Sequence, residues 1–154
     1  MRQIGFDVSE ALAQARRQLP PGPVVEQLRN YCGRAWDVLR TPAFAEAYRQ
    51  SLVRQARTEA ADGAIEACLA DVHRLLVAGV RAGDFRPLPC GQVARLLVSS
   101  LLARAFWCAA SDATDARFAG TCGRVVAETL DVLLPAILAT PPGAPLGAST
   151  GGPA

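Results

Sequence analysis

The stretch LLVAGVRAGDFRPLPCGQVARLLVSSLLARAFW (Leu75–Trp107) is the most informative part of this sequence. It begins as the end of a helix whose apolar residues recur every three or four positions. Gly83 then supplies the residue that most often ends a helix, and a short connector follows, with Phe85 expected in the core. Between Gly91 and Ala110 the sequence is apolar on nearly every side of a helix. This pattern of apolar helices and a tight connector extends in both directions along the chain.

The composition fits one compact helical domain. The chain has 154 residues, of which 51% are hydrophobic and 19% charged, with a formal net charge of +2. It is too apolar for a disordered protein, and its charge is too balanced for a dedicated nucleic-acid binder. Alternating β-branched residues, which indicate strands, are nearly absent. We therefore expect an all-α bundle of about six helices.

Proline, glycine and capping residues divide the chain into three regions. Residues 1–23 are expected to form a short helix, from Val8 to Leu19, and a proline-rich linker. Residues 24–139 form the helical domain, and residues 140–154 are a tail rich in proline and glycine that should be disordered. The remaining helices are expected at Val24–Arg40, Pro42–Ala60, Asp62–Ala82, Gly91–Ala110 and Asp115–Leu138, with Thr41 and Asp62 as N-caps.

The cysteines do not form a metal-binding pattern. No two of them are close enough in sequence for a Cys-x-x-Cys motif, and the single histidine, His73, cannot complete a zinc site with them. An odd number of cysteines on apolar helices favours reduced, buried thiols in a cytoplasmic protein without metal or cofactor. The five cysteines are Cys32, Cys68, Cys90, Cys108 and Cys122.

Neither a signal peptide nor a membrane span is expected. Charged residues at Arg2, Asp7 and Glu10 interrupt any apolar run at the N-terminus. The longest apolar stretch contains Arg95 and Arg104, so it is expected to be a buried helix.

The last two expected helices carry more apolar surface than one chain of this size should bury. Either neighbouring helices of the same chain cover this surface, or a second copy does so through a four-helix interface. We favour the homodimer. Its expected interface residues are Leu102, Phe106, Phe118, Cys122, Val125, Val126, Leu130 and Leu133.

Arg104 is a second indication that these helices have an unusual environment. On a helical projection it falls among Val93, Leu97, Leu101 and Cys108. A buried guanidinium must pair with a carboxylate, extend to solvent, or face a cavity that receives a polar or anionic ligand. The sequence leaves all three possibilities open.

The connector Gly83-Asp84-Phe85-Arg86-Pro87 resembles the turn between the seventh and eighth helices of TetR/AcrR-type transcriptional regulators. The two apolar helices after it resemble the dimerisation helices of that family. Thr41-Pro42-Ala43-Phe44 also resembles a helix start found there. The resemblance covers roughly residues 24–138 and implies the family's C-terminal domain, which binds an effector and dimerises.

One departure from the family concerns DNA binding. Family members begin with three short helices that form a helix-turn-helix, whereas only 23 residues precede the second helix here. These residues contain neither a glycine-centred helix-turn-helix nor the aromatic-rich turn that follows it. We therefore expect DNA contact only through a missing N-terminal domain or a full-length partner.

The resemblance implies a small apolar or aromatic effector bound among the helices at 24–40, 42–60 and 62–82 and the start of 91–110. Each candidate also has an ordinary structural explanation, such as a core tryptophan or a solvent-facing histidine. The alternative function is a helical protein–protein interaction module that binds no small molecule. The candidate ligand residues are Trp36, Tyr48, Leu52, Cys68, Val72, His73, Arg104 and Trp107.

The sequence offers no catalytic constellation. It has no Ser-His-Asp pattern, no glycine-rich phosphate loop and no Glu-x-x-His motif of the helical metal enzymes. We expect no enzymatic activity and assign no catalytic residues.

Overall fold

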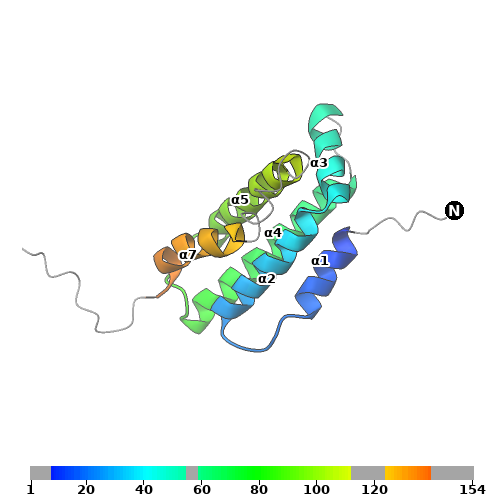
Figure 1. The fold of residues 1–154 in the computed structure, drawn as a ribbon. Coiled ribbons are helices and arrows are strands. Elements are labelled where there is room, and N and C mark those ends of the chain that lie inside the picture. The colour runs from blue at the N-terminus through cyan, green and yellow to red at the C-terminus, as the bar shows by residue number, and fades with distance from the viewer. Residues whose placement is uncertain (1–7, 55–58, 112–123, 140–154) are drawn as a thin grey trace, which may run out of the picture.

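The structure is a computed structural model that describes residues 8–54, 59–111 and 124–139. Within these residues the regular secondary structure is entirely helical, which confirms the expected all-α fold (Figure 1). The expected tail at 140–154 and the first part of the helix expected at Asp115–Leu138 lie outside the described residues. The helices are α1 (Val8–Arg17), α2 (Val24–Leu39), α3 (Pro42–Arg54), α4 (Glu59–Ala82), α5 (Cys90–Ser111) and α7 (Val125–Ile137).

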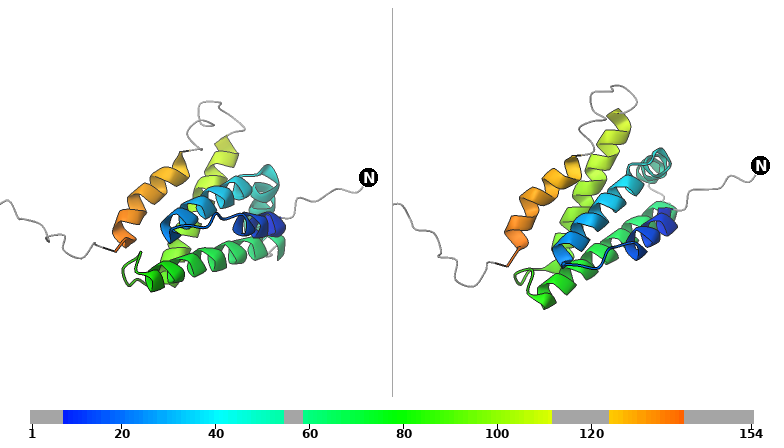
Figure 2. Two further views of the ribbon diagram at one scale, coloured as in Figure 1. Left: turned by 90° about the horizontal axis from the view of Figure 1, so that it is seen from below. Right: turned by 60° about the horizontal axis from the view of Figure 1, so that its bottom comes forward.

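Helices α2 and α4 form the centre of the bundle. Helix α2 packs against α1, α4, α5 and α7, and α4 also contacts α1 and α5. Both Figure 1 and the right-hand view of Figure 2 show α1 and α7 on opposite sides of α2. The core therefore lies between α2, α4 and α5, and α7 closes one side of it.

The local sequence explains where α3 and α4 begin. The Thr41 hydroxyl accepts a hydrogen bond from the Phe44 N–H at 3.4 Å, so Thr41 caps α3 as expected. The expected cap at Asp62 is wrong, because α4 begins at Glu59. Alanine and glutamate are strong helix formers, and a glutamate is favourable at a helix N-terminus. The helix therefore begins before Asp62, at Glu59.

The end of α4 depends on two glycines. Gly83 has a φ of +80°, a conformation that favours glycine, and the Asp84 N–H donates to the Gly79 carbonyl at 2.9 Å. Phe85 is buried, as expected, with 2% of its surface exposed. A Cβ at Gly79 would overlap the Phe85 ring. Glycine at position 79 therefore provides the space in which the connector's phenylalanine packs.

The same connector is fastened to the end of α7. The Arg86 N–H donates to the Ile137 carbonyl at 3.0 Å, and the Ala139 N–H donates to the Asp84 carbonyl at 3.0 Å. The Ile137 carbonyl at the end of α7 thus has a hydrogen-bond partner outside its own helix. The Gly-Asp-Phe-Arg-Pro turn thus joins α4, α5 and α7.

The cysteines differ in part from expectation. Cys32 and Cys68 are buried and free, and Cys90 is half-buried and free. Cys108 is disulfide-bonded, so the expectation of reduced thiols is wrong at that position. Spacing along the sequence could not show this, because a disulfide requires proximity in space.

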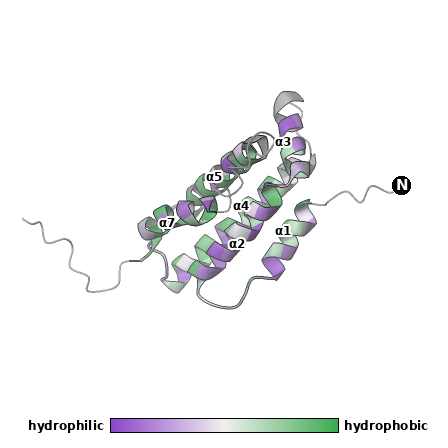
Figure 3. Ribbon diagram, viewed as in Figure 1, coloured by the Kyte–Doolittle hydropathy of each residue, from purple (hydrophilic) through white to green (hydrophobic). Residues whose placement is uncertain are grey.

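Hydropathy is distributed unevenly over the helices. Figure 3 shows hydrophobic residues along much of α5 and α7, whereas α1 and parts of α2 carry more hydrophilic ones. None of the helices in the described ranges is long and apolar enough to cross a membrane.

Candidate functional site

Exposed large hydrophobic side chains are confined to one part of the described structure. All of them lie on α5, on α7 or directly after α7. The exposed fraction is 56% for Leu96, 71% for Trp107 and 75% for Val132. The other two are Phe106 and Leu138, at 37% each. Exposed large hydrophobic side chains that gather on a few helices mark an interaction site more often than single scattered ones do.

On α5 three exposed residues and the half-buried Ser100 follow a regular helical spacing. Leu96, Ser100, Ala103 and Trp107 are separated by four, three and four positions, so they share one side of the helix. The Ser100 hydroxyl donates to the Leu96 carbonyl at 2.8 Å and is therefore satisfied within the helix. The small residues between Leu96 and Trp107 leave room for another helix to approach closely.

On α7 the inward and outward sides separate in the same way. Val126, Leu130 and Leu134 are buried in the core of their own chain. Val132 and Ala136, which lie on the opposite side of the helix, are exposed. We call Leu96, Ser100, Ala103, Trp107, Val132 and Ala136 the outer face of α5 and α7.

The residues expected at a dimer interface are only partly on this outer face. Leu102, Val126 and Leu130 are instead buried against their own chain. Phe106 is partly exposed, and Leu133 is half-buried. Phe118 and Cys122, and the side chain of Val125, lie outside what the structure describes. Leu96 and Val132 are exposed but were not among the interface residues predicted from the sequence, because a helix that is apolar on nearly every side gives no periodic signal for its outward side.

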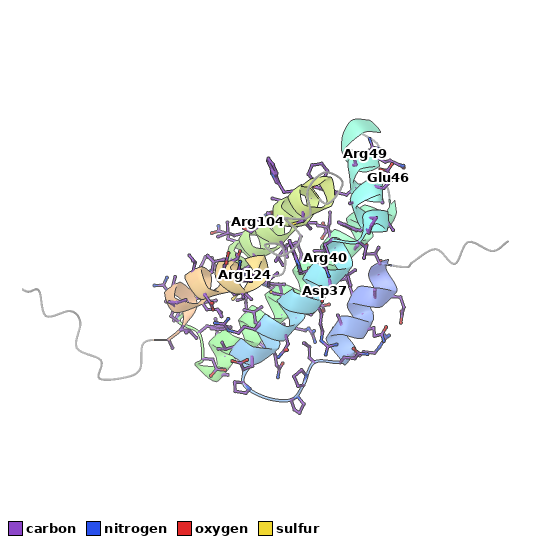
Figure 4. All side chains as sticks on the ribbon, in the orientation of Figure 1. Asp37, Arg40, Glu46, Arg49, Arg104 and Arg124 are labelled. Atoms are coloured by element: carbon purple, nitrogen blue, oxygen red, sulfur yellow. The ribbon has the colours of Figure 1, made fainter. Side chains whose placement is uncertain are left out.

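Leu97, Leu101 and Cys108 beside Arg104 on the helix are buried, whereas Arg104 itself is exposed. Of the three possibilities, the structure therefore shows extension to solvent. Figure 4 labels Arg104 on α5, and its long side chain can reach solvent from there.

The candidate ligand residues fall into separate places. Trp36, Cys68 and Val72 are buried in the core, whereas His73 and Trp107 are exposed. The structure does not describe the side chain of Leu52.

Tyr48 is half-buried and connects α3 to α5. Its ring stacks on Phe44 at 6.0 Å between centroids and meets the edge of Phe106 at 6.4 Å. Such pairs contribute to packing beyond the area they bury. Tyr48 therefore belongs to an aromatic cluster at one end of the bundle.

A buried polar cluster connects α1, α2 and α4. Asp71 is 5% exposed and accepts a hydrogen bond from the Tyr31 hydroxyl at 3.1 Å. Its other partners are Arg74, at 3.2 Å, and Arg16 of α1, at 3.5 Å. Without these partners a buried carboxylate would be costly. This cluster was not predicted from the sequence, although an acid one turn after Cys68 on an apolar side of a helix could have indicated it.

Burial governs the titration of the groups around this cluster. It raises the pKa of the Cys32 thiol to about 12 and that of Cys68 to about 11. Burial, followed by the nearby Cys68 and Asp71, also raises the pKa of the Tyr31 hydroxyl. All three groups therefore stay protonated at neutral pH, which makes them structural groups rather than nucleophiles.

A solvent-open hollow of about 480 Å³ lies along α2. One face of α2 lines it, including Arg29, Gly33, Arg34 and Trp36, and Val126 of α7 completes the lining. No group of metal-binding side chains occurs in the described part of the chain.

Comparison with known structures identifies the fold. The structure is similar to that of a TetR-family transcriptional regulator from Pectobacterium atrosepticum, with a TM-score of 0.64. The two sequences are 20% identical over 90% of this chain and 68% of the regulator. The chain has a TetR-like fold. No protein-family model matches the sequence, and no curated protein is significantly similar to it.

In this TetR-like fold the outer face of α5 and α7 and the buried cluster around Asp71 lie in different parts of the molecule. The outer face of α5 and α7 points away from the core, and the buried cluster around Asp71 joins the helices on the other side of α2. The first is suited to a macromolecular partner, and the second holds α1 against the bundle.

Proposed function

We propose that this chain is the ligand-sensing and dimerisation part of a TetR-like transcriptional regulator and has no DNA-binding helix-turn-helix of its own. The observation that carries the proposal is the concentration of exposed apolar side chains on α5 and α7. In a monomer these side chains would remain in water, whereas a second copy can cover them with the same surface. A homodimer built in this way uses one self-complementary interface.

The proposed dimer brings α5 and α7 of both copies together as four helices. Stable homodimers of this type bury roughly 2,000 Å² or more and resemble a protein core divided in two. The small residues Ser100 and Ala103 would allow close contact in the centre, with Trp107 and Leu96 packing on either side.

The sensing step is proposed as a population shift. A small apolar or aromatic effector would bind among α2, α3 and α4 and favour one position of α1. The Arg16–Asp71 contact at 3.5 Å is the described ionic link between α1 and α4, so it would respond to such a movement. The domain would act in the cytoplasm without a cofactor and without catalysis.

DNA binding would come from a segment outside this chain or from a full-length partner in a mixed dimer. The alignment covers nearly all of this chain and 68% of the regulator.

Introducing negative charge into the outer face tests the dimer. In the double variant Leu96→Glu/Val132→Glu, carboxylates from both copies would be buried against apolar surface, so the protein should elute as a monomer in light-scattering chromatography. The control variant Ala70→Glu places the same charge at an exposed position of α4 and should remain dimeric. A double variant that is still dimeric would refute the interface.

Thermal stabilisation tests the sensing function. A panel of apolar and aromatic compounds should contain members that raise the melting temperature, because a ligand of the folded state stabilises it. A dimer that no compound stabilises would instead favour the interaction module, which pairs with protein and binds no small molecule.

A further inference from the structure

Charged residues border the apolar outer face on α5. Arg95 directly precedes the exposed Leu96, and Arg104 directly follows Ala103. Both arginines are exposed, and neither has an ion-pair partner within the described part of the chain. The sequence of α5 contains no acidic residue. The charged rim of the outer face is therefore entirely positive along α5.

Helix α7 carries the opposite charge. Its charged residues are Glu128 and Asp131, and the helix contains no cation, although Arg124 directly precedes it (Figure 4). Glu128 lies four positions before Val132, which is about one turn, so the two residues share the outer side of α7. Glu128 is exposed and has no ion-pair partner among the described residues, whereas Asp131 is paired with Arg29 of α2 at 2.8 Å. The rim along α7 is therefore negative.

A two-fold dimer can join two such outer faces in two simple ways. Helices α5 and α7 lie side by side in both views of Figure 2. A symmetry axis that runs along the helices places α5 of one copy on α7 of the other, whereas an axis that runs across them places α5 on α5 and α7 on α7. The first arrangement brings opposite charges together. The second brings like charges together, which is unfavourable at an interface.

We infer that the partner of this surface is a second copy of the chain in the first arrangement, with α5 of each copy lying on α7 of the other. The positive rim of α5 then faces the negative rim of α7, and the two-fold symmetry repeats this contact. Arg104, which extends to solvent in the single chain, gains nearby carboxylates that its own chain does not supply. The inference rests on the proposed function, because it requires the dimer.

The charges and the apolar residues have different roles in this arrangement. The apolar residues of the outer face lose their contact with water, which supplies most of the affinity. The charges at the rim determine which surfaces can pair, because electrostatic complementarity contributes more to specificity than to affinity. A chain of the same fold with a negative rim on α5 would therefore be a poor partner.

Charge-reversed variants, measured alone and in mixtures by sedimentation velocity, test the arrangement. Arg95→Glu/Arg104→Glu makes the α5 rim negative, and Glu128→Arg makes the α7 rim more positive. We expect the dissociation constant of the first homodimer to rise about tenfold or more, because like charges then face each other at both contacts. The second homodimer should weaken less, since Asp131 keeps its charge. An equimolar mixture of the two variants restores opposite charges and should dimerise more tightly than either variant alone.

A matched control separates the position of the charges from the net charge. Arg17→Glu/Arg81→Glu changes the net charge by the same amount at exposed positions of α1 and α4. It should dimerise as the wild type does, and it should not rescue Glu128→Arg in a mixture. High ionic strength should reduce the differences between the variants, because salt screens exposed charges.

Three results would overturn the inference although the wild type is dimeric. The first is an Arg95→Glu/Arg104→Glu variant that dimerises as tightly as the wild type. The second is a mixture of that variant with the wild type that associates more tightly than the wild type alone, as α5 on α5 would require. The third is a mixture with Glu128→Arg that shows no rescue. A monomeric wild type would overturn the proposed function as well, so the two failures can be distinguished.

Discussion

The two sides of the bundle handle apolar surface differently. Among the described residues of α1, α2 and α4, the large hydrophobic side chains are buried or half-buried, and the exposed positions are mainly polar or small. On α5 and α7 large hydrophobic side chains occur both in the core and on the outside. Leu96 and Leu97 show the contrast within two adjacent residues, because 56% of the first and 2% of the second is exposed. One side completes its core within the chain, and the other side requires a second surface.

The adjacent leucines provide the largest expected effect. Leu97→Ala should lower the free energy of unfolding by about 2–5 kcal/mol, because it leaves a cavity in the core. Leu96→Ala should change it by less than about 0.5 kcal/mol at protein concentrations where the chain is monomeric, but it should weaken self-association. Urea denaturation of both variants at several protein concentrations checks this. Equal losses in the two variants would show that α5 is oriented differently.

Gly79 tests the packing of the connector. Gly79→Ala should destabilise the protein by about 1–3 kcal/mol, because the added Cβ overlaps the Phe85 ring. This loss would occur although alanine is the better helix former. Thermal or chemical denaturation measures it. A variant as stable as the wild type would mean that Phe85 is not packed on this turn of α4.

The buried titratable groups predict a loss of stability at alkaline pH. Cys32 and Cys68 have pKa values raised by burial from 9.0 to about 12 and about 11. Above about pH 9 the unfolded chain therefore releases these protons first and binds fewer than the folded chain, so stability falls as the pH rises. The stabilisation is complete below that pH and is lost as the pH rises through the folded-state pKa values.

The size of this effect can be measured by urea denaturation across the alkaline range. Each group contributes at most roughly 1.4 kcal/mol per pH unit. Cys32→Ala removes one of them and should make the dependence shallower, and Tyr31→Phe should act in the same direction because burial also raises the pKa of Tyr31. If neither substitution alters the slope, these groups are not buried as described.

Gly33→Ala should change the stability least, and in the opposite direction to Gly79→Ala. Gly33→Ala should stabilise the protein by about 0.5–1 kcal/mol, because a Cβ there meets no neighbour and glycine is unfavourable inside a helix. The same denaturation experiment measures it. Destabilisation at this position would show that the open space beside α2 is filled.

Much of the fold could be predicted from local signals in the sequence. Thr41 as a cap, Gly83 as a helix end and Phe85 as a core residue each follow from the chemistry of a few neighbouring positions, and the structure confirms all three. Asp62 was wrong as a cap because helix-forming residues before it extend α4. Local signals identify helices more reliably than they fix helix ends.

The orientation of the apolar helices could not be predicted in this way. A helix that is apolar on nearly every side gives no periodic signal for which side faces its own core. Leu102 was therefore expected on the outside but is buried, whereas Leu96 is exposed. The cluster around Asp71 was missed for a related reason, since its partners Tyr31 and Arg16 come from other helices.

Sedimentation equilibrium of the wild-type chain at micromolar concentration is the most direct test of the central claim, which is that the outer face of α5 and α7 pairs with a second copy. The account predicts a particle with twice the mass of the chain. A particle with the mass of a single chain throughout the micromolar range would contradict it.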